Sequence, residues 1–145
     1  MTIDVQIQKL YEDAIVPKYA HEGDAGVDLY SHIDHFLKPG ERIIVPTGLK
    51  MAIPEGYEGQ VRPKSGLAIK HGITVLNTPG TVDAPYRGEV GVIIINHSKE
   101  EYPIKKGEKI AQMVFAKVEY ATFKVVDFLD QTSRSDGGFG STGKK

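Results

Sequence analysis

Short apolar segments separated by glycine and proline run along most of the chain. Residues 3–7 alternate apolar and polar side chains with a period of two, which is typical of a strand with one buried face. Further β-branched segments follow, with turn signals such as Pro46 and Gly48 between them. The predicted strands are residues 3–7, 42–45, 49–53, 57–61, 73–76, 89–96, 110–118 and 122–128.

One short helix is predicted over residues 65–71, ended by Gly72. Many short strands at regular spacing together with a single helix predict an all-β fold, a jelly-roll-like β-sandwich or barrel. The three consecutive isoleucines at 93–95 indicate a strand that is covered on both faces, at the centre of a sandwich or at a subunit interface.

The composition changes near Asp130, where β-branched residues give way to glycine, serine and charged residues. We therefore expect a β domain over residues 1–130 and a flexible, glycine-rich tail over residues 131–145. A chain of 145 residues is long enough to bury one core without disulfides or metals.

Charge and residue usage narrow the possible functions. The formal net charge is −1, so no basic field indicates a nucleic-acid partner. The longest strongly apolar run, residues 90–95, is too short to cross a membrane. The chain has no cysteine, which excludes disulfides and thiol catalysis, and its first residues show no secretory leader pattern. We expect a cytoplasmic protein that binds neither nucleic acid nor membranes.

The tail combines glycines and cations with a single aromatic residue, Phe139. Glycine backbone can lie close against a ligand, and exposed N–H groups bind anions, while an aromatic ring can stack on a base. Residues 138–144 also match the GxxxxGK pattern of a Walker A loop, but Lys145 stands where that motif needs serine or threonine. We reject the Walker A reading. Two interpretations remain: a segment that closes over a phosphate-bearing ligand with a ring, or a solvated end.

Several polar side chains fall in predicted turns, where β-scaffolds carry their binding residues. They are Asp28 behind Gly26, Lys64 and Ser65 at the predicted helix start, Asp83 and Tyr86 in the hairpin 77–89, and Gln112 near a late strand. Each of them alone also fits an ordinary role in a turn or in packing. The histidines indicate no metal site, because His32 and His35 lack a third ligand at a useful spacing.

Taken in order, five segments resemble the five motifs of the trimeric dUTP nucleotidohydrolases (dUTPases). They are AGVDL at 25–29, RPKSGLA at 62–68, NTPGTVDAPYRGE at 77–89, GEKIAQ at 107–112 and RSDGGFGSTG at 134–143. The resemblance implies a jelly-roll homotrimer in which each of three active sites draws on all three chains. It further implies hydrolysis of dUTP to dUMP and pyrophosphate with Mg²⁺, which limits uracil in DNA and supplies dUMP for thymidylate synthesis.

The same resemblance implies roles for individual residues in the chemistry. Asp83 would orient and deprotonate the water that attacks the α-phosphorus, and Asp28 would hold Mg²⁺ through water. Lys64, Ser65 and Gly66 would bind phosphate oxygens, with Ser65 facing the departing pyrophosphate.

Other residues would recognise the nucleotide. Asn77 and the hairpin backbone at Gly80, Thr81 and Val82 would bind uracil, while Tyr86 would lie under the deoxyribose. Gln112 would hold the ordered water or the α-phosphate. The tail of another subunit would contribute a stacking ring and phosphate contacts; these residues are Arg134, Phe139, Gly140, Ser141 and Thr142.

The chain departs from the family pattern in three places. Lys64 and Lys109 stand where the family usually carries arginine, and Ala84-Pro85 replaces a common pair before Tyr86. Lysine offers phosphate a point charge instead of a planar fork, which would weaken phosphate binding at position 64 without abolishing it. The other two departures change nothing central.

Two alternatives to dUTP hydrolysis follow from the same resemblance. The related dCTP deaminases share the fold but need a glutamate as proton shuttle, and Ile93 occupies the corresponding position here. A trimer that acts only as a regulatory scaffold is the second alternative. Against it, the polar residues of all five segments are present although they do nothing for folding.

Overall fold

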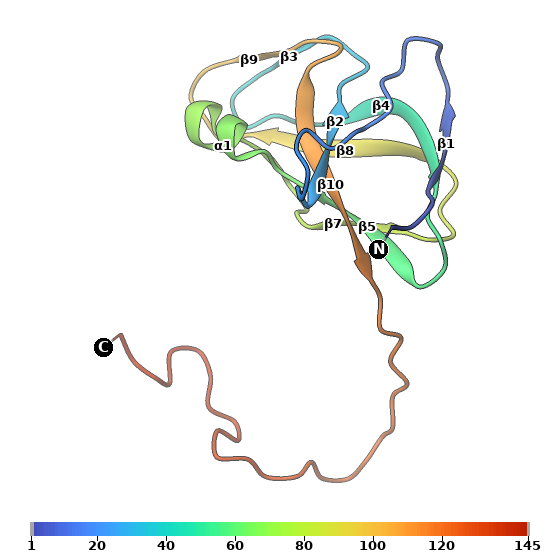
Figure 1. Cartoon of the computed structure of the whole chain (residues 1–145). Coiled ribbons are helices and arrows are strands. Elements are labelled where there is room, and N and C mark those ends of the chain that lie inside the picture. The colour runs from blue at the N-terminus through green and yellow to red at the C-terminus, as the bar shows by residue number, and fades with distance from the viewer. Residues whose placement is uncertain (1, 145) are drawn as a thin grey trace.

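The computed structural model describes residues 2–144 and has two four-stranded sheets, a two-stranded sheet and one short helix. Figure 1 shows these elements gathered into one body, from which the last residues extend as a long tail. The elements are β1 (Gln6–Lys9), β2 (Gly26–Tyr30), β3 (His35–Leu37), β4 (Arg42–Ala52), β5 (Tyr57–Arg62), α1 (Ser65–His71), β6 (Ile73–Val75), β7 (Gly80–Asp83), β8 (Glu89–Asn96), β9 (Tyr102–Ile104) and β10 (Lys109–Lys117).

The sheets are built from strands that lie far apart in the sequence. One sheet has the order β1-β4-β8-β6, the second has β2-β10-β5-β7, and β3 pairs with β9. The strand pairings are antiparallel. The predicted all-β jelly roll with a single short helix is therefore confirmed for the described residues.

The core lies between the two large sheets. It consists of buried aliphatic side chains from both sheets, among them Leu29, Val45, Val92, Ile94 and Met113. Of the three consecutive isoleucines, Ile94 faces this core, whereas Ile93 and Ile95 are half-buried on the opposite face of β8. Within one chain, apolar neighbours therefore cover the inner face of β8. That its outer face is also covered stays a prediction.

Strand β4 joins two predicted strands across Pro46 and Gly48. The pairing with β8 shifts between Pro46 and Lys50, which is a bulge, and Gly48 has a φ of 75° that favours glycine. The buried Thr47 hydroxyl donates to the carbonyl of Val90 at 2.6 Å. The turn signals at 46–48 therefore mark a bend within one strand and not a loop between two.

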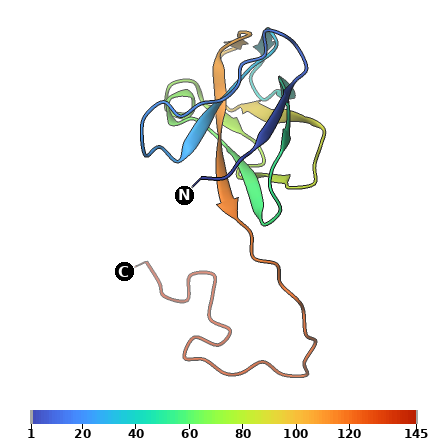
Figure 2. The ribbon, with the colours of Figure 1, turned by 45° about the vertical axis from the view of Figure 1, so that its right-hand side comes forward.

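The predicted strand over residues 122–128 is wrong. Among the described residues no strand follows β10, and Phe123 and Val125 are 93% and 97% exposed. A β-branched segment needs a free strand edge to pair with, and this one runs away from the body in both views (Figures 1 and 2). The first strand is also displaced, since residues 3–5 lie outside β1.

The short helix forms as predicted and ends at Gly72. Gly72 adopts the left-handed conformation with φ 64°, and its N–H donates to the carbonyls of Leu67 and Ala68. Over residues 2–144, no helix has the length and apolar character needed to span a membrane.

Candidate active site

Three polar side chains form a row across the sheet β2-β10-β5-β7. Gln112 on β10 pairs with Asp28 on β2 on one side and with Arg62 on β5 on the other. Directly opposed residues in an antiparallel sheet point to the same face, so the three side chains lie side by side. The fold thus brings Asp28 and Gln112 together although they are far apart in the sequence.

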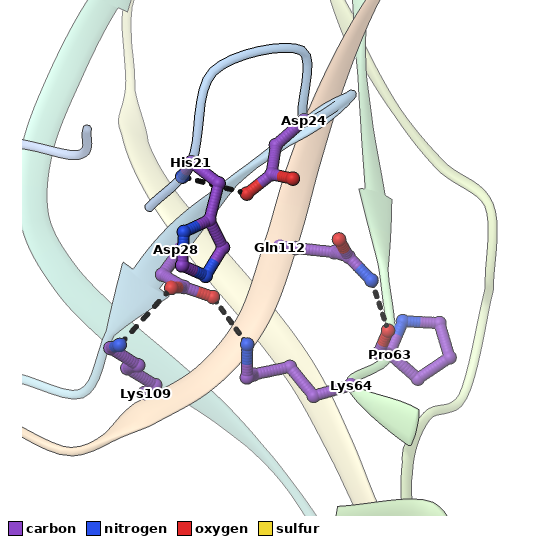
Figure 3. A network of polar contacts seen from close by, with 7 residues as sticks. All are labelled: His21, Asp24, Asp28, Pro63, Lys64, Lys109 and Gln112. Atoms are coloured by element: carbon purple, nitrogen blue, oxygen red, sulfur yellow. Dashed lines mark hydrogen bonds and ion pairs between the residues drawn. The ribbon is translucent and has the colours of Figure 1, made fainter. Parts of the chain in front are cut away.

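Asp28 is the centre of a small charge cluster (Figure 3). Its Oδ1 forms an ion pair with Nζ of Lys64, and its Oδ2 lies 3.4 Å from Nζ of Lys109. The Asp28 side chain is only 13% exposed, whereas that of Lys109 is 50% exposed. The sequence analysis assigned Lys64 to phosphate binding and missed the contact between Lys109 and Asp28. This contact depends on strand register across the sheet, which no local pattern shows.

Lys109 is held in place by the turn before β10. The N–H of Gly107 donates to the carbonyl of Ser31 at 2.7 Å, and that of Lys106 donates to the Asp34 carboxylate at 2.9 Å. The Lys106 ammonium, 2.5 Å from Asp13, lowers the pKa of the Asp13 carboxyl by hydrogen bonding. These contacts fix where β10 begins and so place Lys109 beside Asp28.

Gln112 is oriented by a hydrogen bond and by the absence of a side chain opposite it. Its Nε2 donates to the carbonyl of Pro63 at 2.9 Å (Figure 3). A Cβ at Gly26 would overlap the Oε1 of Gln112. Glycine at position 26 therefore leaves the space that the Gln112 amide occupies.

We expect Gly26→Ala to lower the turnover that the resemblance to the dUTPases implies, while leaving the fold intact. The added methyl meets only the far end of a flexible side chain, so Gln112 turns away and loses its bond to Pro63, which costs about 1 kcal/mol. The melting temperature should fall by a few degrees at most, whereas kcat should fall several-fold. Wild-type turnover in Gly26→Ala would contradict the role of Gly26 in leaving space for the Gln112 amide.

Ser65 and Gly66 begin α1 directly after Lys64. Both are exposed, and no side chain caps the first turn of this helix. The space where a Cβ would stand at Gly66 is open. An exposed hydroxyl and uncapped N–H groups beside a lysine form a place where phosphate oxygens can bind.

The hairpin carries a second group of predicted residues. Asn77 packs its amide against buried Gly80, where a Cβ would come 3.1 Å from Nδ2. Thr81 and Val82 continue β7 to Asp83, whose side chain is exposed at the strand end. These residues offer backbone and side-chain polar groups along one edge strand.

Tyr86 is fixed at its hydroxyl, which donates to the carbonyl of Glu89 at 2.9 Å. A Cβ at Gly88 would overlap this hydroxyl, and Tyr86 is 47% exposed. Arg87, which sequence reasoning did not single out, donates to the carbonyls of Ala84 and Tyr86 at 2.5 and 3.0 Å. The ring therefore presents an exposed face on a turn that Arg87 braces.

Within one chain, the group of residues around Asp28 lies apart from the group on the hairpin. Asp83 pairs with Glu58, four residues along β5 from Arg62, which lies in the row with Asp28. Three strand spacings and four residues of rise separate Asp28 from Asp83 by about 20 Å. The fold of a single chain therefore joins Asp28, Lys64, Ser65 and Gln112 but leaves the hairpin residues elsewhere.

The tail residues are not brought to either group. The Arg134 side chain donates to the carbonyl of Gly137 at 2.6 Å, and the N–H of Ser141 donates to the carbonyl of Gly138 at 3.1 Å. Phe139 is fully exposed, Gly140 and Thr142 are exposed, and the tail lies away from the body (Figure 1). Its predicted contacts need a ligand or another copy of the chain.

The described residues contain no cluster of three or more histidine, cysteine or acidic side chains that could hold a metal alone. A single carboxylate, Asp28, beside a helix start with an uncapped first turn still fits Mg²⁺. This ion keeps several waters and is usually held by one or two carboxylates together with substrate phosphates.

Comparison with known proteins identifies the family. The family model described as dUTPase matches residues 12–143, so the chain belongs to the dUTPase family, a class of nucleotide hydrolases. Two bacterial relatives carry the full name deoxyuridine 5'-triphosphate nucleotidohydrolase. That of Syntrophotalea carbinolica is 53% identical over 98% of both chains, and that of Fusobacterium nucleatum is 57% identical over 97% of this chain and 98% of its own.

Solved structures agree with this assignment. The dUTPase of Staphylococcus bacteriophage 80alpha with dUPNHPP superposes with a TM-score of 0.89 at 30% identity, over 98% of this chain and 99% of that chain. A mutant of the dUTPase from phage phi11 of S. aureus, described with a structural Mg(II) ion, gives a TM-score of 0.81 at 28% identity, over 89% of this chain and 100% of that chain.

The position where a deaminase would need its glutamate is Ile93, which lies on β8 opposite Ile44. The deaminase alternative therefore has no support.

Proposed function

We propose that this protein hydrolyses dUTP to dUMP and pyrophosphate by attack of water on the α-phosphorus. The observation that carries the proposal is the convergence of Asp28, Lys64 and Gln112 on one face of the sheet, beside Ser65 at the start of α1. Positioned charge is what phosphoryl transfer needs from a protein, since little covalent chemistry is required.

In this mechanism Asp83 is the general base. Its carboxylate lies exposed at the end of β7 and is free to orient a water and accept its proton. Lys64, Ser65 and Gly66 hold oxygens of the β- and γ-phosphates and favour departure of pyrophosphate. Gln112, held by Pro63, orients the water or the α-phosphate.

Asp28 would hold Mg²⁺ through water ligands, next to the phosphate oxygens. When bound, the ion supplies positive charge that offsets the charge developing on the phosphates. The remaining residues bind and orient the nucleotide and the water.

The hairpin selects the base. Asn77 and the backbone from Gly80 to Val82 present fixed donors and acceptors to uracil. Cytosine carries the opposite pattern at its N3 and C4 edge and would leave buried groups unpaired. Discrimination of this kind reaches about 10⁴-fold.

Tyr86→Ala is expected to admit the ribose sugar. The Tyr86 ring, anchored through its hydroxyl to Glu89, forms a rigid wall against a 2′-hydroxyl. Removing the wall should raise UTP hydrolysis relative to dUTP hydrolysis, measured as the ratio of kcat/KM. Tyr86→Phe keeps the ring and is the matched control. If the ratio is the same in the alanine variant and in wild type, Tyr86 only packs against the turn.

We further propose that the working unit is a homotrimer in which different chains complete each site. The separation of about 20 Å between Asp28 and Asp83 supports this, because one nucleotide cannot bridge both groups within a chain. An unpartnered apolar face supports it too. Ile44, 67% exposed, lies opposite Ile93 on the outer side of the β4-β8 pair. The exposed residues Phe123 and Val125 beyond β10 add further apolar area.

Mixing two inactive variants should restore activity if sites are shared. Asp28→Asn and Asp83→Asn proteins are unfolded together in equal amounts, refolded, and assayed for dUTP hydrolysis. In randomly mixed trimers, about a quarter of shared sites contain both native carboxylates. Each variant refolded alone is the control. Mixed trimers that remain inactive would mean that each site belongs to one chain, as would sedimentation showing a fully active monomer.

The division of the chain follows from the same proposal. Residues 1–130 form the β domain with its apolar extension, and residues 131–145 form a tail that closes over the site of another subunit. There Phe139 stacks on the base, while Arg134, Gly140, Ser141 and Thr142 bind the γ-phosphate side. In the cytoplasm the reaction would limit uracil in DNA and supply dUMP for thymidylate synthesis.

The direct test of the function is pyrophosphate release from dUTP with and without Mg²⁺. We expect turnover that depends on Mg²⁺ and is far slower with dCTP and UTP. Absence of pyrophosphate from a folded protein would support the scaffold alternative.

A further inference from the structure

The two ion pairs of Asp28 point to a role for Lys109. We propose that Lys64 and Lys109 together keep Asp28 closed to divalent metal in the free protein, so that the ion is accepted only with the triphosphate. This inference rests on the proposed function, because it concerns the same site. It makes Lys109 a positioning residue that acts through Asp28.

The positions of the two lysines explain why the Asp28 carboxylate is not open to a divalent metal in the free protein. The two lysines approach the carboxylate from different elements, Lys64 from the start of α1 and Lys109 from the first position of β10. Each takes one oxygen, Lys64 at Oδ1 and Lys109 at Oδ2 (Figure 3). Since both oxygens of Asp28 are engaged, an ion or its water ligand must displace at least one lysine.

Charge opposes metal binding to the free cluster. One carboxylate and two ammonium groups within ion-pair distance give a formal charge of −1 + 2 = +1. A divalent cation is repelled by such a cluster. A triphosphate adds several negative charges, which reverse the sign of the field and offer the lysines new partners.

Lys109 is the group best suited to move. Its side chain is 50% exposed and its Nζ lies 3.4 Å from Asp28, whereas Lys64 is 29% exposed and in closer contact. A flexible, solvated ammonium can turn from a carboxylate to a phosphate with little change in packing. Nucleotide and metal therefore bind with positive coupling, and Lys109 contributes to it.

The test is a titration of the nucleotide-free protein with Mn²⁺. Binding is measured as the loss of the electron paramagnetic resonance signal of free Mn²⁺. We expect weak binding to wild type and about tenfold tighter binding to Lys109→Met, because one repelling charge is removed and Oδ2 of Asp28 is released. Lys109→Arg keeps the charge and should bind as weakly as wild type. Lys117→Met removes an equal charge at the far end of β10 and should also match wild type.

Two further titrations locate the effect. Asp28→Asn combined with Lys109→Met should lose the gain, because the ion then has no carboxylate. With dUpNHpp present, Mn²⁺ should bind tightly to wild type, and the advantage of Lys109→Met should shrink. Unchanged affinity in Lys109→Met, or an equal gain in Lys117→Met, would overturn the proposal.

The outcome is separable from that of the proposed function. The Mn²⁺ titration of the free protein has no dependence on turnover, so it decides the role of Lys109 even if dUTP is not the substrate. Conversely, active wild type that binds Mn²⁺ equally well with and without dUpNHpp would retain dUTP hydrolysis and reject the lysine proposal.

Discussion

Asp83→Asn should reduce kcat for dUTP by about 10²–10⁴-fold, the usual cost of losing a general base. Asparagine keeps the size of the side chain and can still orient a water, but it cannot accept the proton. Because Asp83 is exposed at the end of β7, the substitution should leave the melting temperature nearly unchanged. The measurement is steady-state turnover together with dUpNHpp affinity, which should survive.

The control for this variant is Asp4→Asn, which changes an exposed carboxylate before β1. It should keep wild-type turnover. If Asp83→Asn also turns over at the wild-type rate, the base lies elsewhere. If it loses dUpNHpp binding together with turnover, Asp83 serves binding and not proton transfer.

Removal of the tail after Gln131 should lower kcat by about 10²-fold or more, since several phosphate contacts are lost at once. In the proposed mechanism, closure of the tail would exclude water and complete the phosphate cage. These contacts should strengthen as charge moves to the leaving pyrophosphate, so kcat should fall more than KM rises. The truncation spares all the described strands, because β10 ends at Lys117, so assembly and melting temperature should change little.

Two variants refine this prediction. Phe139→Ala should lose only base stacking, about 1–3 kcal/mol, and keep the phosphate contacts. A shorter truncation after Gly143 keeps the glycine-rich stretch and should stay close to wild type. If the long truncation dissociates the assembly, the tail is structural, and if it leaves kcat intact, the tail has no part in catalysis.

Local sequence pattern predicted much of the fold because alternation and turn residues act at short range. Strand β8 matches its predicted bounds, and Gly72 ends α1 as expected. The strand predicted over 122–128 failed because β-propensity records only a tendency to pair, and this segment leaves the body without pairing with any described strand.

The site was predictable only through the family resemblance. Nothing local shows that Gln112 lies beside Asp28, because strand register across the sheet brings them together. The contact of Lys109 with Asp28 depends on the same register, so charge patterning along the chain could not reveal it. Arg87 was missed for a similar reason, since its partners are backbone carbonyls of its own turn.

The exposed stretch that contains Phe123 and Val125 has a consequence for how the chain is made. β-branched and aromatic segments without a partner are prone to add to any open sheet. In this chain the stretch follows the ten described strands, so during synthesis it leaves the ribosome after the sheets that it could invade have their own strands available. With the proposed trimer, the hazard would be confined to the interval between completion of one body and its meeting with other copies, and that interval would shorten as expression rises.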